Sequence, residues 1–157
     1  MKAASLNEIK KELSYLDLKK VQELCMRLAK YKKENKELLT YLLFEADDES
    51  GYVTGVKNEI DDHFTLLPKS NVYLIKKSLR KILRITNKQI KYSEAKRTEV
   101  ELRIHFCAKM KKSGIRSLSS QVLANMYNQQ LKKIEIALAK LPEDLQYDYH
   151  NEFEQLK

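Results

Sequence analysis

The sequence is poor in the residues that form tight turns, with three glycines and two prolines among its 157 residues. A many-stranded sheet needs hairpins, and hairpin turns depend on residues that tolerate positive φ. No segment reaches the about 20 apolar residues that a helix needs to cross a bilayer. These shortages argue against a β-fold and against a membrane-spanning fold, and they predict an all-α protein without membrane insertion.

Cysteine is also scarce, with only Cys25 and Cys107 in the chain. Disulfide scaffolds are dense in cysteine, and both residues lie among apolar neighbours at helical spacing. We therefore expect two buried thiols in a reducing compartment. The opening residues, MKAASLNEIKKEL, lack the uninterrupted apolar stretch of a signal peptide, which predicts a cytoplasmic protein.

The composition is that of an ordinary soluble protein, with 43% hydrophobic and 33% charged residues. A domain of this length buries about 70% of the surface that its unfolded chain exposes, so it needs no disulfide or metal to fold. We expect residues 1–157 to form a single all-helical domain.

Apolar residues recur at three- and four-residue steps through most of the chain, which predicts about seven to eight amphipathic helices. Ser5 and Glu8 occupy the positions of a capping box for a short first helix. A later helix should end before Pro68, because the residue preceding proline disfavours helical dihedral angles. The stretch 47–55 contains two of the three glycines and is interpreted as a loop.

The second half of the chain contains the most regular patterns. A long helix is predicted over 71–92. In 95–110 apolar side chains occupy much of the helix circumference, which indicates that this helix is central. Gly114 should break it, and a last helix after Pro142 should bury a stripe made of Leu145, Tyr149, Phe153 and Leu156.

Two helical arrangements fit these patterns. Tyr15-Leu16 matches Tyr73-Leu74 at an offset of 58 residues, which suggests helix-pair halves over 5–67 and 71–157. A true duplication favours stacked helical pairs, as in a short α-solenoid of the HEAT or armadillo kind. Chance matches between amphipathic helices are common, so an irregular helical bundle is the alternative.

Positive charge is concentrated in the middle of the chain. The net charge is +8, and residues 69–93 carry eight basic and no acidic side chains. On a helical wheel with about 100° per residue, the apolar residues of 71–92 fall on one side and the cations on the other. The predicted binding residues are Lys76, Lys77, Arg80, Lys81, Arg84, Lys88 and Lys91 of this helix, together with Lys109, Lys112 and Arg116 of the following segment.

Several uses of this basic face are physically reasonable. We predict a non-enzymatic interaction module that engages an acidic protein surface; the alternative is a nucleic-acid-associated protein that binds phosphate backbone through the same face. Only Tyr73 joins the basic arc, whereas single-strand stacking needs several exposed aromatic residues. A simpler interpretation is a solvated face, neutralised within the chain by acids of 45–49 or by Glu59, Asp61 and Asp62.

The chain lacks a recognisable catalytic, metal or cofactor motif. An EF-hand loop starting at Asp47 would need glycine at its sixth position, but Gly51 is the fifth. Glu59 and His63 could share a helix face, but a transition metal needs at least one more ligand. His105 is expected to be a hydrogen-bonded histidine at the core boundary, and Tyr147 is expected to be exposed. We therefore predict no enzyme, no metal and no cofactor.

Overall fold

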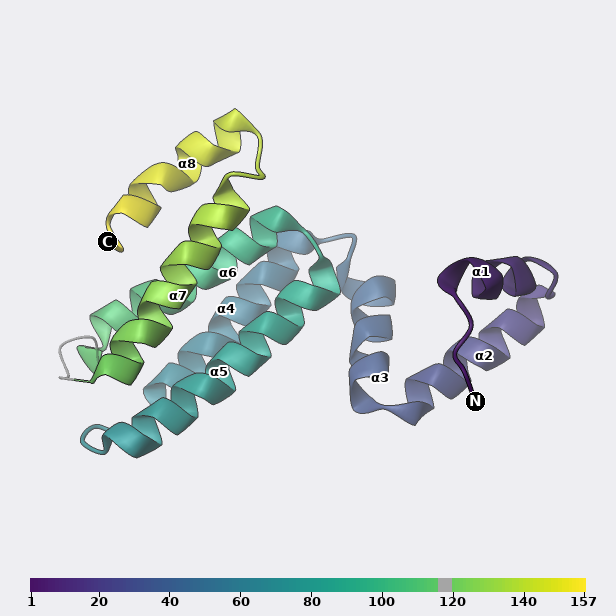
Figure 1. Cartoon of the computed structure of the whole chain (residues 1–157), viewed down its shortest axis with the longest axis horizontal. Helices are drawn as coiled ribbons and strands as arrows, with labels where there is room; N and C mark the ends of the chain where they lie inside the picture. Colours follow the sequence, from purple (N-terminus) through teal and green to yellow (C-terminus); the bar gives the residue numbers. More distant parts are fainter. Residues whose placement is uncertain (116–119) are drawn as a thin grey trace. The chain divides into compact units, whose positions relative to one another are not determined.

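The computed structural model describes residues 1–115 and 120–157. These residues form eight α-helices and one π-helical turn, and they contain no β-strand (Figure 1). The prediction of an all-α fold with seven to eight helices is thereby confirmed. Among the same residues, no helix combines the length and the apolar character needed to span a bilayer.

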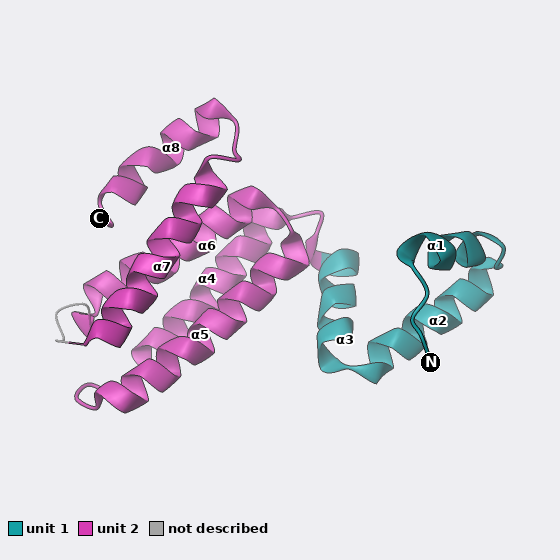
Figure 2. Cartoon of the chain, viewed as in Figure 1, with its two compact units in different colours: residues 1–44 teal, residues 45–157 magenta. Residues whose placement is uncertain are grey.

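The internal contacts divide the chain into two compact units, residues 1–44 and residues 45–157 (Figure 2). The helix-pair halves considered from the sequence, 5–67 and 71–157, meet at a different position. The difference arises because the helix that follows residue 48 packs against the helices after it. Whether the two units fold as one domain stays a prediction, as does the internal duplication.

Unit 1 consists of three helices and all but the last residue of a π-helical turn. The capping box predicted at its start is present: Glu8 N donates to Ser5 Oγ at 3.3 Å, and Ser5 N donates to Glu8 Oε2 at 2.7 Å. The second and third helices pack against each other. The elements are α1 (Leu6–Ser14), α2 (Leu18–Tyr31), α3 (Lys33–Thr40) and η1 (Tyr41–Glu45).

Unit 1 buries few of its side chains. Within α1, α2 and α3, only Ala29 is buried. Cys25 is exposed, so the prediction of two buried thiols is wrong for this residue and right for Cys107. The cause is that the apolar stripe of α2 has too small a partner in α3 to be covered completely.

The described residues of unit 2 form a bundle of five α-helices arranged around α6. This helix packs against α4, α5 and α7 (Figure 1), and side chains around most of its circumference are buried, including Val100, Leu102, Phe106 and Cys107. The predicted central position of the helix is confirmed. The elements are α4 (Glu49–Thr65), α5 (Val72–Ser93), α6 (Lys96–Lys112), α7 (Gln121–Leu138) and α8 (Glu143–Glu154).

The predicted loop over 47–55 is wrong for most of its length, because α4 begins at Glu49 and includes both Gly51 and Gly55. The Asp48 side chain caps the helix and accepts a hydrogen bond from Gly51 N at 2.9 Å. Each glycine costs a helix roughly 1 kcal/mol relative to alanine. Burial of Tyr52 and of the apolar residues after it offsets that cost.

The other predicted breaks are confirmed. Helix α4 ends at Thr65, three residues before Pro68, and α6 ends at Lys112, followed by Gly114 at φ +71°. The stripe of the last helix is also largely confirmed, since Tyr149, Phe153 and Leu156 are buried. The C-terminus is held in place by Tyr127, whose hydroxyl donates to the Leu156 carbonyl oxygen at 2.7 Å.

Candidate interaction surface on helix α5

Helix α5 is one unbroken rod of 22 residues. Asn71 caps its start by accepting a hydrogen bond from Leu74 N at 3.1 Å. The helix ends where Glu94 adopts the left-handed conformation, with φ 57°, and its backbone N–H bonds the Ile90 carbonyl. The predicted helix over 71–92 is therefore confirmed to within a residue at each end.

One side of α5 is buried in the bundle. Ile75, Leu79, Ile82, Thr86 and Ile90 are all buried, as the helical wheel predicts. Burial of each large apolar side chain contributes about 1.5–3 kcal/mol. The Thr86 hydroxyl donates to the Ile82 carbonyl at 3.0 Å, so even the polar member of this stripe is satisfied without water.

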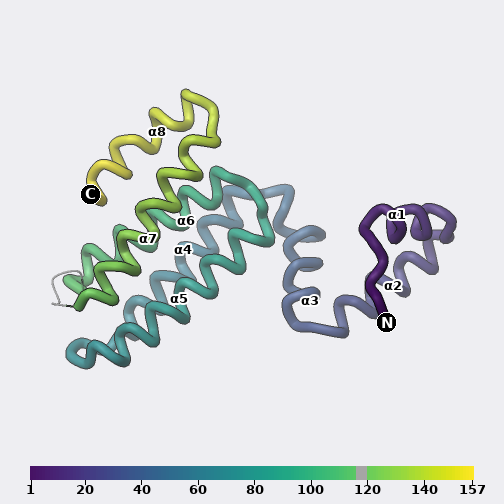
Figure 3. The backbone as a smooth tube through the Cα atoms, viewed as in Figure 1, coloured from purple at the N-terminus to yellow at the C-terminus, as the bar shows by residue number. Residues whose placement is uncertain are grey.

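Polar contacts fix the rotation of α5 about its axis. The Tyr52 hydroxyl of α4 lies 3.1 Å from the Gln89 carbonyl oxygen and 2.8 Å from Gln89 Oε1. Arg103 of α6, itself buried, donates from Nη1 to Asn87 Oδ1 at 3.0 Å and to Gln130 Oε1 of α7 at 2.8 Å. Figure 3 shows α5 and α6 joined as a helical hairpin, and the Arg103–Asn87 hydrogen bond connects its two helices. Because the buried side of α5 is held in this way, the opposite side must face outward.

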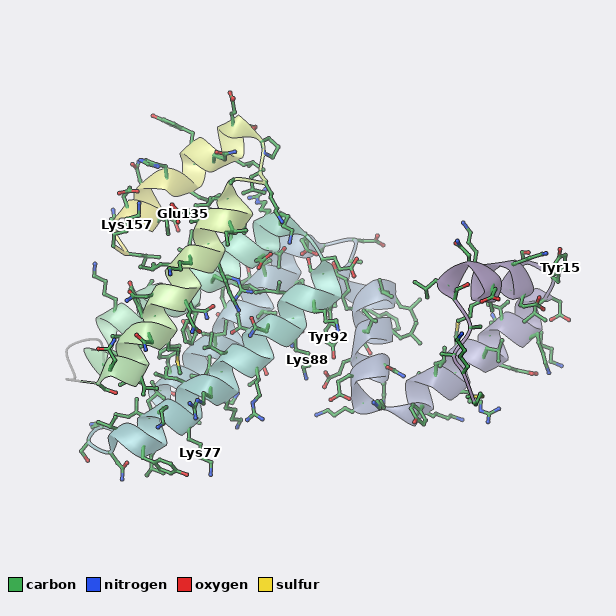
Figure 4. All side chains as sticks on the ribbon, viewed as in Figure 1. Tyr15, Lys77, Lys88, Tyr92, Glu135 and Lys157 are labelled. Carbon is green, nitrogen blue, oxygen red and sulfur yellow. The ribbon has the colours of Figure 1, made fainter. Side chains whose placement is uncertain are left out.

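The outward side carries the predicted cations. Lys77, Lys81 and Arg84 are exposed, and Figure 4 shows Lys77 and Lys88 projecting on the same side of the helix. The structure therefore brings together on one rod the seven residues that the sequence analysis singled out there: Lys76, Lys77, Arg80, Lys81, Arg84, Lys88 and Lys91.

The chain itself does not neutralise most of these charges. In residues 1–115 and 120–157, no carboxylate lies within ion-pair distance of six of them: Lys76, Lys77, Arg80, Lys81, Arg84 and Lys91. Like charges three or four residues apart on a helix each destabilise it by about 0.2–0.5 kcal/mol. The fold accepts this repulsion on α5 without an acidic partner for these six side chains.

Several cations of the neighbouring helix α6 have carboxylate partners. Every basic side chain of α6 from Lys96 to Arg103 pairs with a carboxylate of the same helix. Glu101 pairs with two cations, Arg97 of α6 and Lys57 of α4. The distances are 2.9 Å for Lys96–Glu99, 3.1 Å for Arg97–Glu101, 3.0 Å for Arg103–Glu99 and 2.9 Å for Lys57–Glu101.

These pairs use the carboxylates of the bundle. Burial by itself raises the pKa of Glu101, but hydrogen bonds from Tyr149, Lys57 and Arg97 outweigh it and hold that pKa below its ordinary value of 4.5. The same competition, with Lys96 and Arg103 as donors, lowers the pKa of Glu99. Both groups are therefore charged at neutral pH and already hydrogen-bonded to their own cations.

Lys109, one of the predicted binding residues, also has a partner within the chain. Its Nζ lies 2.6 Å from Asp61 Oδ2, and His105 Nε2 lies 2.6 Å from Asp61 Oδ1. Burial raises the pKa of Asp61, but the hydrogen bonds from Lys109 and His105 outweigh it and lower that pKa overall. Asp61 thus faces α6 rather than α5, and the expectation for His105 as a hydrogen-bonded boundary residue is confirmed.

The remaining two predicted residues lie beyond α5. Lys112 is exposed at the C-terminal end of α6. Arg116 lies outside the described residues. The candidate surface therefore consists of the α5 cations, and Lys109 does not add a free charge to it.

The first turn of α5 adds apolar surface to this face. Tyr73 is 66% exposed, and Lys76 Nζ lies 5.7 Å from the centre of its ring. Val72 and Leu74 beside it are also exposed, although the wheel predicts Val72 to be buried. The cationic strip therefore ends in a small apolar patch with one aromatic ring.

Two further observations concern metal-binding and thiol groups. In the described part of the chain, no cluster of three His, Cys, Asp or Glu side chains is arranged to hold a metal ion. Burial raises the pKa of the Cys107 thiol to about 12, so it is not a thiolate at neutral pH. Tyr147 is 79% exposed, as expected.

Sequence reasoning missed the cluster that joins α4, α6 and α8. The Tyr149 hydroxyl donates to Glu101 Oε1 at 2.6 Å, and Arg97 Nε donates to that hydroxyl at 3.0 Å. Burial and the bond to Glu101 raise the pKa of Tyr149 to about 12. The spacing of Arg97 and Glu101 by four residues is a visible signal of helical pairing, but nothing local in the sequence indicates Tyr149 or Lys57.

Comparisons of the chain with protein-family models, with curated proteins and with solved structures found no match.

Proposed function

We propose that this protein is a non-enzymatic helical interaction module whose α5 cationic face binds an acidic surface of another protein. One observation carries the proposal. Six cations of α5 have no carboxylate partner within the described residues, whereas the cations of α6 from Lys96 to Arg103 are paired. A face that served only solubility could alternate charges, as α6 does, and would avoid the repulsion.

The spacing of the cations suits a rod-shaped partner. Lys77, Lys81, Arg84, Lys88 and Lys91 follow steps of four and three residues. At 1.5 Å per residue, the strip from Lys77 to Lys91 is about 21 Å long. A helix with glutamates at the same steps presents carboxylates along the same line. The partner that fits best is therefore an acidic helix packed along α5.

Charge alone gives a weak complex. An exposed ion pair contributes about 0.2–1 kcal/mol, so five such pairs contribute roughly 1–5 kcal/mol, which corresponds to a dissociation constant no tighter than about 0.2 mM. Aromatic and arginine side chains supply much of the binding energy at interfaces. Tyr73, next to Lys76, is the aromatic anchor that this face offers, and it can contribute the apolar part of the contact.

Phosphate backbone is the competing ligand for the same cations. Lysine and arginine neutralise phosphates with release of counterions, which makes such binding strongly salt-dependent. Single-strand binding also relies on several stacked aromatic residues, and Tyr73 is the one aromatic residue of the cationic face. The acidic-protein reading is therefore favoured, and nucleic acid is tested as the alternative.

The test measures fluorescence anisotropy of three labelled probes at about 50 mM salt. They are a helical peptide with glutamates at alternating steps of four and three and one leucine near its end, a DNA duplex, and a DNA single strand. The variant Lys81→Gln/Arg84→Gln removes two charges from the face. The control Lys133→Gln/Lys140→Gln removes two charges from exposed positions, one in the C-terminal half of α7 and one just after the helix.

We expect a dissociation constant of tens to hundreds of micromolar for the peptide. The α5 variant should raise this constant about fivefold, since two lost ion pairs amount to about 1 kcal/mol. The control variant should bind as the wild type does. Tighter binding of either DNA probe, with the same loss in the α5 variant, would assign the face to nucleic acid instead. An unchanged peptide affinity in the α5 variant would remove the basis of the proposal.

A further inference from the structure

Unit 1 exposes most of its large apolar side chains. The helices α1, α2 and α3 bury a single side chain, Ala29. Large apolar residues of α2 and η1 are open to solvent, with Met26 at 53%, Leu43 at 62% and Phe44 at 75% exposure. Contiguous exposed apolar surface on a soluble protein marks an interaction site.

Part of this surface forms a groove within unit 1. The groove lies between α2 and the segment formed by α3 and η1, and its volume is about 550 Å³. Its apolar lining consists of Met26, Ala29, Leu39, Leu43 and Phe44. Amphipathic helices dock into grooves of this kind between two packed helices, inserting apolar side chains from one face.

The π-helical turn gives the groove part of its lining. In η1 the hydrogen-bond register changes from the α-helical one over Tyr41–Glu45. In this turn Leu42, Leu43 and Phe44 are all exposed although they are consecutive. Well under 1% of residues lie in π-helices, and single π-turns are frequent at functional sites. The π-turn is therefore a further sign of a binding site at the groove that it partly lines.

Lysines surround the groove. Its lining includes Lys30, Lys32, Lys33 and Lys36 and no acidic residue. Lys33 lies 3.5 Å from Glu37, but Lys30, Lys32 and Lys36 have no carboxylate partner in the part of the chain that the structure describes. An apolar floor inside a cationic rim selects a ligand with the opposite arrangement, an apolar stripe between rows of carboxylates.

From this arrangement we infer that unit 1 binds an acidic amphipathic helix of a partner protein in the groove between α2 and α3. The inference does not depend on the function proposed for α5, because it uses other residues and needs apolar insertion. A second copy of this chain is a poor occupant. Two lysine-rimmed grooves repel each other, and the acidic helix α8 already buries its own apolar stripe through Tyr149 and Phe153.

A membrane surface is also a poorer fit than a helix. An anionic bilayer would attract the lysines, and an amphipathic helix can lie in its interface. A bilayer is flat, however, whereas the apolar residues here line a concavity. Anionic vesicles are therefore the comparison probe, and binding to them in place of the peptide overturns the inference.

The experiment uses the full-length chain and an 18-residue labelled peptide with leucines at helical steps of three and four and glutamates on both flanks. One control peptide replaces each glutamate with lysine, and another has the same composition in scrambled order. Vesicles of phosphatidylcholine and phosphatidylserine form the fourth arm. Sedimentation of the free protein over a range of concentrations tests self-association.

Two variants address the apolar floor and the cationic rim separately. Leu43→Ser/Phe44→Ser removes apolar groups that are already exposed, so it should leave the helical content intact. Lys32→Glu/Lys36→Glu reverses the charge of the rim. The matched control is Leu66→Ser/Ile136→Ser, which removes apolar groups of 77% and 60% exposure from unit 2. Circular dichroism checks that every variant keeps its helices.

We expect micromolar binding of the acidic peptide, weakened roughly tenfold or more by either groove variant and unchanged by the control. The α5 variant Lys81→Gln/Arg84→Gln should leave this affinity unchanged, which separates the two proposals. The inference fails if the lysine peptide or the scrambled peptide binds as well, if vesicles bind and the peptide does not, or if the Leu43→Ser/Phe44→Ser variant merely dissociates a dimer.

Discussion

Replacing Arg84 with glutamate should stabilise the protein, because of the charges along α5. Three basic residues lie three or four positions from it: Arg80, Lys81 and Lys88. Each pair changes from repulsive to attractive. If each like-charge pair costs about 0.2–0.5 kcal/mol and each opposite pair contributes a similar amount, the swing is roughly 0.5 kcal/mol per pair. The expected gain for Arg84→Glu is therefore about 1.5 kcal/mol at low salt.

The measurement is the free energy of unfolding from urea denaturation at about 10 mM and 1 M salt. At 1 M the Debye length is about 3 Å, so most of the gain should disappear. The same variant should lose binding of the acidic helical peptide. Positive charge on this face would then favour binding, whereas negative charge would favour stability, and such a conflict is common at functional sites.

Lys133→Glu provides the control, because it changes the net charge by the same amount on another exposed helix position. The residues three or four positions away from it are all uncharged: Gln129, Gln130, Ile136 and Ala137. It should leave stability within about 0.5 kcal/mol of the wild type. If Arg84→Glu gains no more than this control, or if its gain survives 1 M salt, the idea of unrelieved repulsion along α5 is refuted.

Three further predictions concern the bundle and the thiols. Because the folded pKa of Glu101 lies below its ordinary 4.5, its carboxylate stabilises the fold above pH 4.5 and loses that effect as pH falls through the lower folded pKa. Glu101→Gln should therefore lower the free energy of unfolding by about 2 kcal/mol at pH 7 and should weaken the loss of stability at acid pH, measured by urea unfolding at several pH values. An unchanged acid dependence would contradict this. A thiol reagent should label exposed Cys25 at once and buried Cys107 only on unfolding, whereas equal rates would show that the core is open. In chemical denaturation, Gly55→Ala should raise the free energy of unfolding by roughly 1 kcal/mol, because the new methyl group would lie in open space within α4. Gly114→Ala should lower it by about 1 kcal/mol, because Gly114 has a φ of +71°. Equal effects of the two substitutions would count against these backbone conformations.

Helix positions could be predicted because the signals for them are local. The capping pair Ser5 and Glu8, the proline at 68 and the glycine at 114 all act within a few residues of the break that they cause. The wheel of α5 is also local, and its buried stripe from Ile75 to Ile90 follows from spacing alone. The cationic side then follows from the same wheel.

The errors arose where burial overrides local preference. Gly51 and Gly55 favour a loop, but Tyr52, Val53 and Val56 bury their side chains only if the segment is helical. Cys25 was misplaced for the opposite reason. Its spacing indicates a buried stripe, yet α2 in unit 1 lacks a partner large enough to cover that stripe.

The composition of the candidate site needed tertiary information. Nothing in the sequence near Lys109 shows that Asp61, almost fifty residues away, would take up its charge. The groove of unit 1 was equally hidden, because an apolar stripe has the same spacing whether it is covered or open. Only the structure separates the cations that pair with carboxylates of the chain from those that have no carboxylate partner among the described residues.

The most direct test of the account is an NMR titration of the ¹⁵N-labelled protein with the glutamate-rich helical peptide used for the α5 face. If the α5 face binds the peptide, chemical-shift changes should appear along one side of α5, from Tyr73 through Lys77, Lys81 and Arg84 to Lys91, and should disappear in the Lys81→Gln/Arg84→Gln variant. Shift changes confined to other helices, or none at concentrations that give binding by anisotropy, would contradict it.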